Sequence, residues 1–318
     1  MFASREVLTR LRHWLSAGVC IVVIGSLQSS PAQSAGSTCP TTVGRCPLQG
    51  CSNSNSAFAP FDGLLNAQKN HPDGPAVPKN PPYSVADTMD EAQLPVHVPP
   101  TPDGKDLRTT WNHTPDYQKI STFEKRQATV EGYIVHAHPG GAESCNCDIA
   151  SKNVLDTHVN VVDKPQDPNV DPTTLPGVSL IAEITWRVRK THPDWTAANL
   201  KQLDLQHTGA RVRITGDLLY DNVHWDMIHK NQRGTLWEIH PIRRIQVLVR
   251  NSWVDLSAAK GALGMTAPGA QALTGAMAIA PSGAAAMAPS PALSNAFKPR
   301  WTPAQLQKLE QTFGEDHS

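Results

Sequence analysis

The sequence lacks an excess of charge of either sign, because 28 Lys and Arg residues balance 28 Asp and Glu residues. Composition therefore excludes a general charge-driven attraction to nucleic acid or acidic lipid. After residue 35 the chain also lacks an apolar run of the ~20 residues that a membrane-spanning helix needs. It has no HExxH, GxSxG or P-loop motif, so it shows no signature of the enzyme classes that these motifs define.

The first residues have the order of a secretory signal peptide. A basic start is followed by an apolar run over residues 14–27 and then by small residues ending at Ala35. A retained anchor is the weaker alternative, because the run is shorter than the ~20 residues that span a bilayer. We expect residues 1–35 to be removed. The mature protein is then exported, to the periplasm or the extracellular space, with no transmembrane anchor.

Export makes disulfides possible, and the cysteine count is informative. Removal of Cys20 with the signal leaves five, which are Cys39, Cys46, Cys51, Cys145 and Cys147. This number is odd, so one thiol is free or pairs between chains. One disulfide within the first three would close a small loop. The last two are too close for an easy mutual bridge. A zinc site at this Cys-x-Cys pair is the alternative, although the usual zinc ligand spacing is longer.

Two segments have compositions that are typical of disordered chain. Residues 36–105 are rich in proline and contain the first cysteine cluster, so we expect an extended linker. Residues 256–294 are rich in Ala, Gly, Pro and Met and are expected to be disordered. Residues 295–318 predict a short helix with Thr302 as its N-cap, Pro303 in its first turn and Gly314 at its end. That helix either docks on the domain or binds a partner.

The folded domain is predicted over residues 106–255 and is mainly β. Five strand signals lie at 129–138, 157–162, 178–189, 210–220 and 236–249, with a bend expected at Pro241. One helix, capped by Thr196, lies between the third and fourth strands. This order resembles the OB-fold, a five-stranded Greek-key barrel. Gly132 and Gly216 lie inside strands, where a tightly curled barrel often has a bulge or a bend. An open sheet with a helix on one face is the alternative.

Two short segments add to this resemblance. His192-Pro193-x-Trp195 and the run Trp237-Glu238-Ile239-His240-Pro241 resemble signatures of exported bacterial OB-like domains whose function is unsettled. The resemblance implies a fold and no activity. Staphylococcal-type nucleases also have an OB-like barrel, but their spaced Asp, Arg and Glu set is not visible here, so no active site is transferred.

Strand periodicity places acids and histidines together on faces opposite the apolar side chains. Asp156 and His158 share one face of the second strand, Glu183 and Arg187 one face of the third, and Glu238 and His240 one face of the fifth. The loop after the first strand adds Glu143. Such faces have an ordinary interpretation as well, since polar side chains on the solvent side of a sheet and cross-strand Glu–Arg pairs are common.

Three functions are compatible with this pattern. The preferred one is a binding module for an oligomer, either glycan or nucleic acid, with ligand contacts from Asn160, Arg211, Arg213, Glu238 and His240. The second is a metal-assisted hydrolase of phosphodiesters, with Asp156, His158, Glu183 and Arg187 as catalytic residues. Its divalent metal ion would be held by Glu143, Asp156, His158 and His240. The third is a structural envelope domain without catalysis, and whether the protein is an enzyme stays open.

Overall fold

The computed structural model describes residues 38–52, 61–71, 81–95, 108–164, 174–205, 207–263, 265 and 302–314. The predicted signal peptide and most of the segment 256–294 lie outside these residues. None of the helices within the described ranges is long and apolar enough to cross a membrane.

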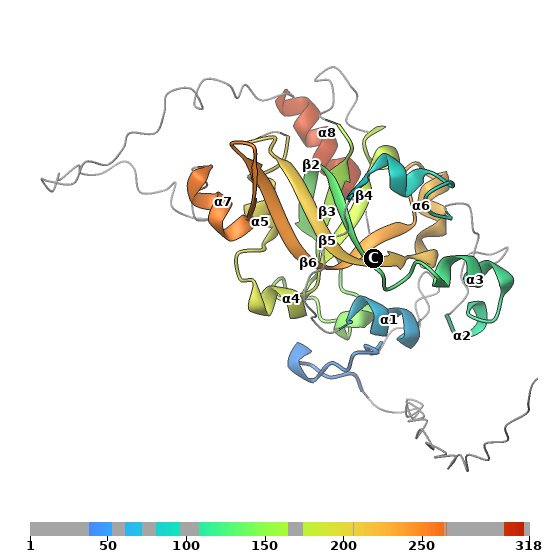
Figure 1. The fold of residues 1–318 in the computed structure, drawn as a ribbon. Helices are drawn as coiled ribbons and strands as arrows, with labels where there is room; N and C mark the ends of the chain where they lie inside the picture. Colours follow the sequence, from blue (N-terminus) through green and yellow to red (C-terminus); the bar gives the residue numbers. More distant parts are fainter. Residues whose placement is uncertain are drawn as a thin grey trace, which may run out of the picture. The chain divides into compact units, whose positions relative to one another are not determined.

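Five strands close into a barrel (Figure 1). They are β2 (Gln127–Pro139), β3 (Thr157–Val162), β4 (Leu180–Ile184), β5 (Arg211–Tyr220) and β6 (Trp237–Val249). The order β2-β3-β4-β6-β5 is closed by antiparallel pairing of β2 with β5, and β4 runs parallel to β6. Two short strands extend the sheet, with β1 (Tyr83–Ser84) beside β2 and β7 (Ser252–Asp255) beside β6. The prediction of a mainly-β, closed five-stranded barrel is confirmed, and the strand order is consistent with an OB-like barrel.

The barrel interior is filled by aliphatic and aromatic side chains. Ile134, Val159, Ile214 and Trp237 belong to one buried core, as period-two alternation along each strand predicts. The bend expected near Pro241 is present, because the β5–β6 register shifts on both sides of Gly216. A Cβ at Gly216 would lie 2.3 Å from the Pro241 carbonyl oxygen. The close approach of two backbones therefore requires glycine at this position.

The predicted third strand, 178–189, is wrong in its second half. Strand β4 ends at Ile184, and helix α4 (Trp186–Thr191) begins two residues later. The Thr185 hydroxyl accepts a hydrogen bond from the Val188 N–H and so caps the helix. The prediction was too long because the alternation of apolar and polar residues along β4 continues past the first residues of α4. Arg187 consequently lies on α4 and does not share a strand face with Glu183.

The connection from β4 to β5 contains a second helix, α5 (Ala197–Lys201). Its predicted N-cap is confirmed, because the Thr196 hydroxyl accepts a hydrogen bond from the Asn199 N–H at 3.2 Å. In the turn before it, the His192 ring stacks on Trp195 with centroids 3.9 Å apart. Trp195 is buried in the core, so this turn closes against the barrel.

The expectation that residues 36–105 form only an extended linker is corrected by the structure. Residues 38–52 and 61–71, called here the N-terminal cover, contain helix α1 (Gly63–Lys69) and pack against the domain. The Asp62 carboxylate caps α1 by accepting from the N–H groups of Leu64 and Leu65, and it also accepts from the Arg108 N–H. The high proline content of residues 36–105 predicted an extended chain, and it gave no sign of the shorter stretches within them that pack against the domain.

The remaining helices surround the barrel. They are α2 (Arg108–Trp111), α3 (Pro115–Ser121), α6 (Trp225–His229), α7 (Leu256–Ala262) and α8 (Pro303–Gly314). Helix α7 occupies the start of the segment 256–294 and buries Leu256 and Ala259. The expectation that the whole segment is disordered is therefore wrong for these residues. Helix α8 matches the predicted C-terminal helix, and the Thr302 hydroxyl accepts from the Gln305 N–H as its N-cap.

Candidate metal centre

Strand β3 is buried on both of its faces. Val159 and Val161 point into the core, as expected, but His158 and Asn160 on the other face are also buried. Helix α1, which lies at the same end of the barrel as α4 (Figure 1), reaches this face through the Lys69–Glu143 ion pair, and Glu143 lies 3.6 Å from His158. The polar strand face that was expected to meet solvent is therefore enclosed by protein, so its side chains must satisfy one another.

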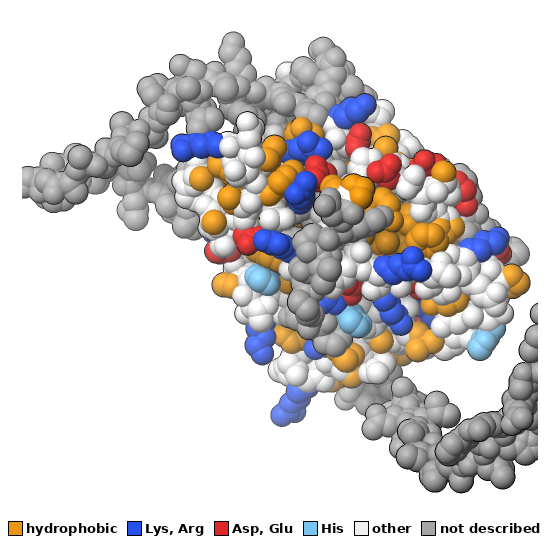
Figure 2. Space-filling model, in the orientation of Figure 1, with side chains coloured by type: hydrophobic (Ala, Val, Ile, Leu, Met, Phe, Trp, Pro, Cys, Tyr) orange, Lys and Arg blue, Asp and Glu red, His pale blue; other side chains and the backbone are white. Residues whose placement is uncertain are grey.

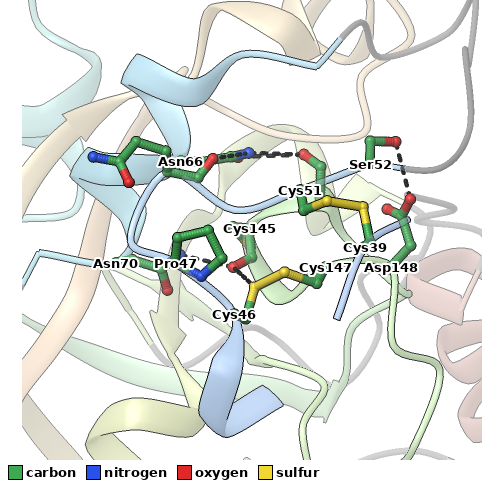
Figure 3. Close-up of a disulfide and its surroundings, with 12 residues drawn as sticks. Cys39, Cys46, Pro47, Cys51, Ser52, Asn66, Asn70, Cys145, Cys147 and Asp148 are labelled. Carbon is green, nitrogen blue, oxygen red and sulfur yellow. Dashed lines mark hydrogen bonds between the residues drawn. A yellow bond between two sulfur atoms is a disulfide. The ribbon is translucent and has the colours of Figure 1, made fainter. Parts of the chain in front are cut away.

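Two disulfides hold the N-terminal cover in place, and they lie side by side (Figure 3). Cys39–Cys51 closes the small loop that was predicted, and Cys46–Cys147 joins the cover to the loop after β2. The remaining thiol, Cys145, is free and buried. The prediction of one unpaired cysteine is confirmed, whereas a zinc site at the Cys-x-Cys pair is wrong because Cys147 is consumed by a disulfide.

Side-chain contacts strengthen this attachment. The Asn70 amide donates to the Cys145 carbonyl at 2.7 Å. Arg187 on α4 donates from Nε to Asn70 Oδ1 at 3.0 Å and from Nη2 to the Cys46 carbonyl at 2.8 Å. Arg187, predicted as a catalytic residue, thus fastens the cover to the barrel.

Beneath the cover, five side chains come together that the sequence had singled out as acids and histidines. We call them the buried cluster: Glu143, Asp156, His158, Glu183 and His240. Their side chains are only 0 to 14 % exposed. The Glu183 carboxylate lies at the centre, with Oε1 3.4 Å from His158 Nε2 and Oε2 3.1 Å from His240 Nδ1.

The other two carboxylates flank this centre. Glu143 Oε1 lies 3.6 Å from His158 Nε2, and Asp156 Oδ2 lies 4.0 Å from His240 Nε2. The Cys145 thiol has two alternative acceptors in the flanking carboxylates, Glu143 Oε2 at 3.4 Å and Asp156 Oδ2 at 3.9 Å. Asp156 Oδ1 accepts from the Asn146 amide and from the Trp186 N–H. These two donors orient the carboxylate, and its second oxygen faces His240 and the Cys145 thiol.

Lys69 is a buried cation that the sequence reasoning missed. Its ammonium group lies 3.0 Å from Glu143 Oε2 and 3.7 Å from Asp221 Oδ2. Burial lowers the pKa of Lys69, but these two carboxylates outweigh burial and hold that pKa well above its usual value. The lysine was overlooked because it belongs to a segment that was interpreted as linker.

A second polar group lies beyond Lys69. The His224 Nδ1 atom is 2.6 Å from Asp221 Oδ2, and Arg233 donates to Glu238 at 2.8 Å. Glu238 Oε2 lies 3.4 Å from His240 Nδ1, which links this group to the buried cluster. Glu238 was predicted to contact a ligand, and the structure instead shows it buried with Arg233 as its ion-pair partner.

The charges are unequal in this region. Four buried carboxylates, at positions 156, 183, 221 and 238, and the partly buried Glu143 face two permanent cations, Lys69 and Arg233. Burial raises the pKa of Glu183 to about 7 and also raises that of Asp156. Burial lowers the pKa of His240, but Glu183 and Glu238 outweigh it and raise that pKa overall. The shifts are not uniform across the region, because Lys69 and the neighbouring histidines outweigh burial at Glu143 and lower its pKa.

The remaining predicted ligand contacts do not join the buried cluster. Arg211 and Arg213 both form ion pairs with Glu131, at 2.7 and 2.5 Å. The Arg213 guanidinium also lies over the Trp253 ring. Asn160 is buried and donates to Ser179 Oγ at 3.3 Å. On the face drawn in Figure 2, basic side chains are scattered among acidic and apolar ones. The charges of Arg211 and Arg213 are therefore neutralised locally by Glu131.

A groove of about 360 Å³ lies elsewhere on the domain. Its walls include His192, Trp195, Arg243 and Arg244, so the His-Pro-x-Trp segment borders it. Arg243 is held by Asp217 and Arg244 by Asp255. The groove shares no residue with the buried cluster.

A scan against protein-family models and a search of curated proteins both find no match for this chain. The functional argument therefore depends on the geometry of the buried cluster itself.

Proposed function

We propose that this protein is an exported, OB-like barrel protein that binds a divalent metal ion in the buried cluster. The observation that carries the proposal is the Nε2 atom of His240. This atom is buried, and it has no hydrogen-bond partner among the described residues. A buried polar atom without a partner costs about 1–3 kcal/mol, and it lies 4.0 Å from a carboxylate oxygen of Asp156. A cation between the two atoms satisfies both.

The spacing of the donor atoms supports this proposal. Two ligand atoms at about 2.1 Å from one metal ion, at a tetrahedral angle, are about 3.4 Å apart. The separations of His158 Nε2 from Glu183 and Glu143, 3.4 and 3.6 Å, and of His240 Nε2 from Asp156, 4.0 Å, are of this order. Groups of three ligand atoms from Asp156, Glu183 and His240, and from Glu143, His158 and Glu183, each lie within 4.8 Å of one another.

The donor types favour a transition metal. Imidazole nitrogens combined with carboxylate oxygens are typical of zinc sites and also suit Mn²⁺ and Fe²⁺, whereas Ca²⁺ and Mg²⁺ prefer oxygen donors alone. The second layer is also typical, because Asn146 fixes the Asp156 carboxylate and Glu238 contacts the far nitrogen of His240. We therefore take Zn²⁺ as the preferred ion and Mn²⁺ as its competitor.

Enclosure indicates what kind of ligand fits. The side chains of the buried cluster are too little exposed to contact a glycan or a nucleic acid strand, and the arginines expected to bind one are paired with Glu131. A single ion needs no open surface. Two disulfides per chain support export, since they persist in oxidising compartments.

The test is a metal-binding measurement on full-length mature protein treated with chelator. Zn²⁺ and Mn²⁺ would be titrated separately, and bound metal would be counted after equilibrium dialysis. We expect tight Zn²⁺ binding that His240→Ala weakens at least about tenfold. His207→Ala, which removes a half-exposed histidine outside the cluster, should bind as the wild type does. No metal retained by folded wild-type protein would refute the proposal.

Metal-assisted hydrolysis is a second candidate, favoured by one observation. Glu143 and His158 form the least buried edge of the cluster, so an opening there would admit water to a bound metal ion. Labelled single-stranded and duplex nucleic acid would be incubated with the zinc-loaded or manganese-loaded protein and resolved on a denaturing gel. Cleavage that is lost in Asp156→Asn supports this activity, and intact substrate with fully loaded protein removes it.

A further inference from the structure

The two oxygens of the Glu183 carboxylate face two different imidazoles. Oε1 lies 3.4 Å from His158 Nε2, and Oε2 lies 3.1 Å from His240 Nδ1. Glu183 is itself buried on strand β4, between the strands that carry the two histidines. A carboxylate between two imidazoles can give one oxygen to each of two positions, and one nitrogen of His240 lies within 4.8 Å of oxygens from both Glu183 and Asp156.

Each side of this bridge has its own second carboxylate. Glu143 lies beside His158 at 3.6 Å, and Asp156 lies beside His240 at 4.0 Å. The set therefore divides into two groups of three, Glu143–His158–Glu183 and Asp156–Glu183–His240, each with ligand atoms within 4.8 Å. The two groups share only Glu183.

We propose that the buried cluster binds two divalent metal ions bridged by Glu183, which deepens the proposed function and rests on it. One position is formed by Glu143, His158 and Glu183, and the other by Asp156, Glu183 and His240. Two-metal centres have ions about 3.5–4 Å apart, a distance that one bridging carboxylate spans. At the second position, Glu183 Oε2 and His240 Nε2 are both buried with no hydrogen-bond partner among the described residues.

The surroundings fit two cations better than one. Lys69 neutralises Glu143 through Oε2 alone, so Glu143 Oε1 remains directed toward His158. Asp156 likewise uses Oδ1 for the Asn146 amide and the Trp186 N–H, and Oδ2 remains directed toward His240. Each flanking carboxylate thus has one oxygen held by nitrogen donors and a second oxygen directed toward its own position, which for Asp156 Oδ2 also lies 3.9 Å from the Cys145 thiol.

The experiment counts ions per chain in the full mature protein. Chelator-treated wild type would be dialysed against increasing free Zn²⁺ and, separately, Mn²⁺, and bound metal would be measured by mass spectrometry. We expect about two ions per chain at saturation, and a spin-coupled Mn²⁺ spectrum in electron paramagnetic resonance that is absent at low loading. His158→Ala and His240→Ala should each retain about one ion.

The outcomes separate the two proposals. Saturation at one ion per chain, with an uncoupled Mn²⁺ spectrum, overturns the two-ion centre and leaves the proposed metal binding intact. Saturation at zero overturns both. The wild-type measurements need no variant to fold, and each variant would be compared with His207→Ala for native circular dichroism. A folded His158→Ala protein that loses both ions also overturns the division into two positions.

Discussion

Removal of the Cys46–Cys147 disulfide should destabilise the protein more than removal of Cys39–Cys51. The first bridge closes a sequence separation of 101 residues and the second only 12. Loop-closure entropy then gives about 4.7 kcal/mol for the long loop and about 3 kcal/mol for the short one at 25 °C. The expected difference in the free energy of unfolding between the two double-serine variants is therefore somewhat below about 2 kcal/mol.

The assay is urea unfolding of the wild type, Cys46→Ser/Cys147→Ser and Cys39→Ser/Cys51→Ser, followed by circular dichroism. The long-range variant should also lose zinc affinity, because Glu143 and Cys145 lie in the loop that Cys147 ties to the N-terminal cover. The short-range variant serves as the matched control and should keep that affinity. Equal stabilities together with unchanged zinc binding in both variants would refute the view that this bridge holds the cover over the cluster.

Two further predictions concern the barrel and its pH response. Gly216→Ala should lower the free energy of unfolding by about 1–3 kcal/mol, since a Cβ would lie 2.3 Å from the Pro241 carbonyl oxygen. Gly44→Ala is the control and should leave this free energy unchanged, because nothing lies within 4 Å of its Cβ. Equal urea midpoints for the two variants would contradict this prediction. The hydrogen bond to Asp204 raises the pKa of His207 above 6.5, so this histidine stabilises the fold below its unfolded pKa and loses that contribution as pH rises through the folded pKa. His207→Gln should therefore be less stable than wild type at about pH 6 and equal to it at about pH 9, and a pH-independent difference would count against the assignment.

Much of the barrel follows from local pattern. Strand β3 has the predicted bounds, and β2, β5 and β6 are within two residues of theirs. These strands alternate apolar and polar residues between clear turn signals, which is the strongest local signal of a strand. The third strand was overextended because Trp186 and Val188 continue its alternation, while the helix start depends on a single cap at Thr185. Local periodicity does not distinguish a short strand followed by a helix from one long strand.

The members of the buried cluster were also identified from the sequence, but their environment was not. Asp156, His158, Glu183 and His240 were placed on solvent-facing strand faces, where polar residues usually lie. Alternation reports which side chains share a face and says nothing of what covers that face. The burial comes from α1 and the loop after β2, two segments distant in sequence, and no periodic pattern connects them.

The cysteine positions indicate which segment covers the polar strand face. Five cysteines can form at most two disulfides, and Cys145 and Cys147 are too close to pair with each other. If both disulfides form within one chain, at least one of that pair must therefore bond to the group of three in the proline-rich segment. Such a bond carries the segment to the loop that holds Glu143, directly beside Asp156 and His158, and it does so as Cys46–Cys147. If both disulfides form within one chain, the cysteine positions thus predict that the proline-rich segment is bonded to the loop after β2. This bond places the segment beside the polar strand face that was expected to meet solvent.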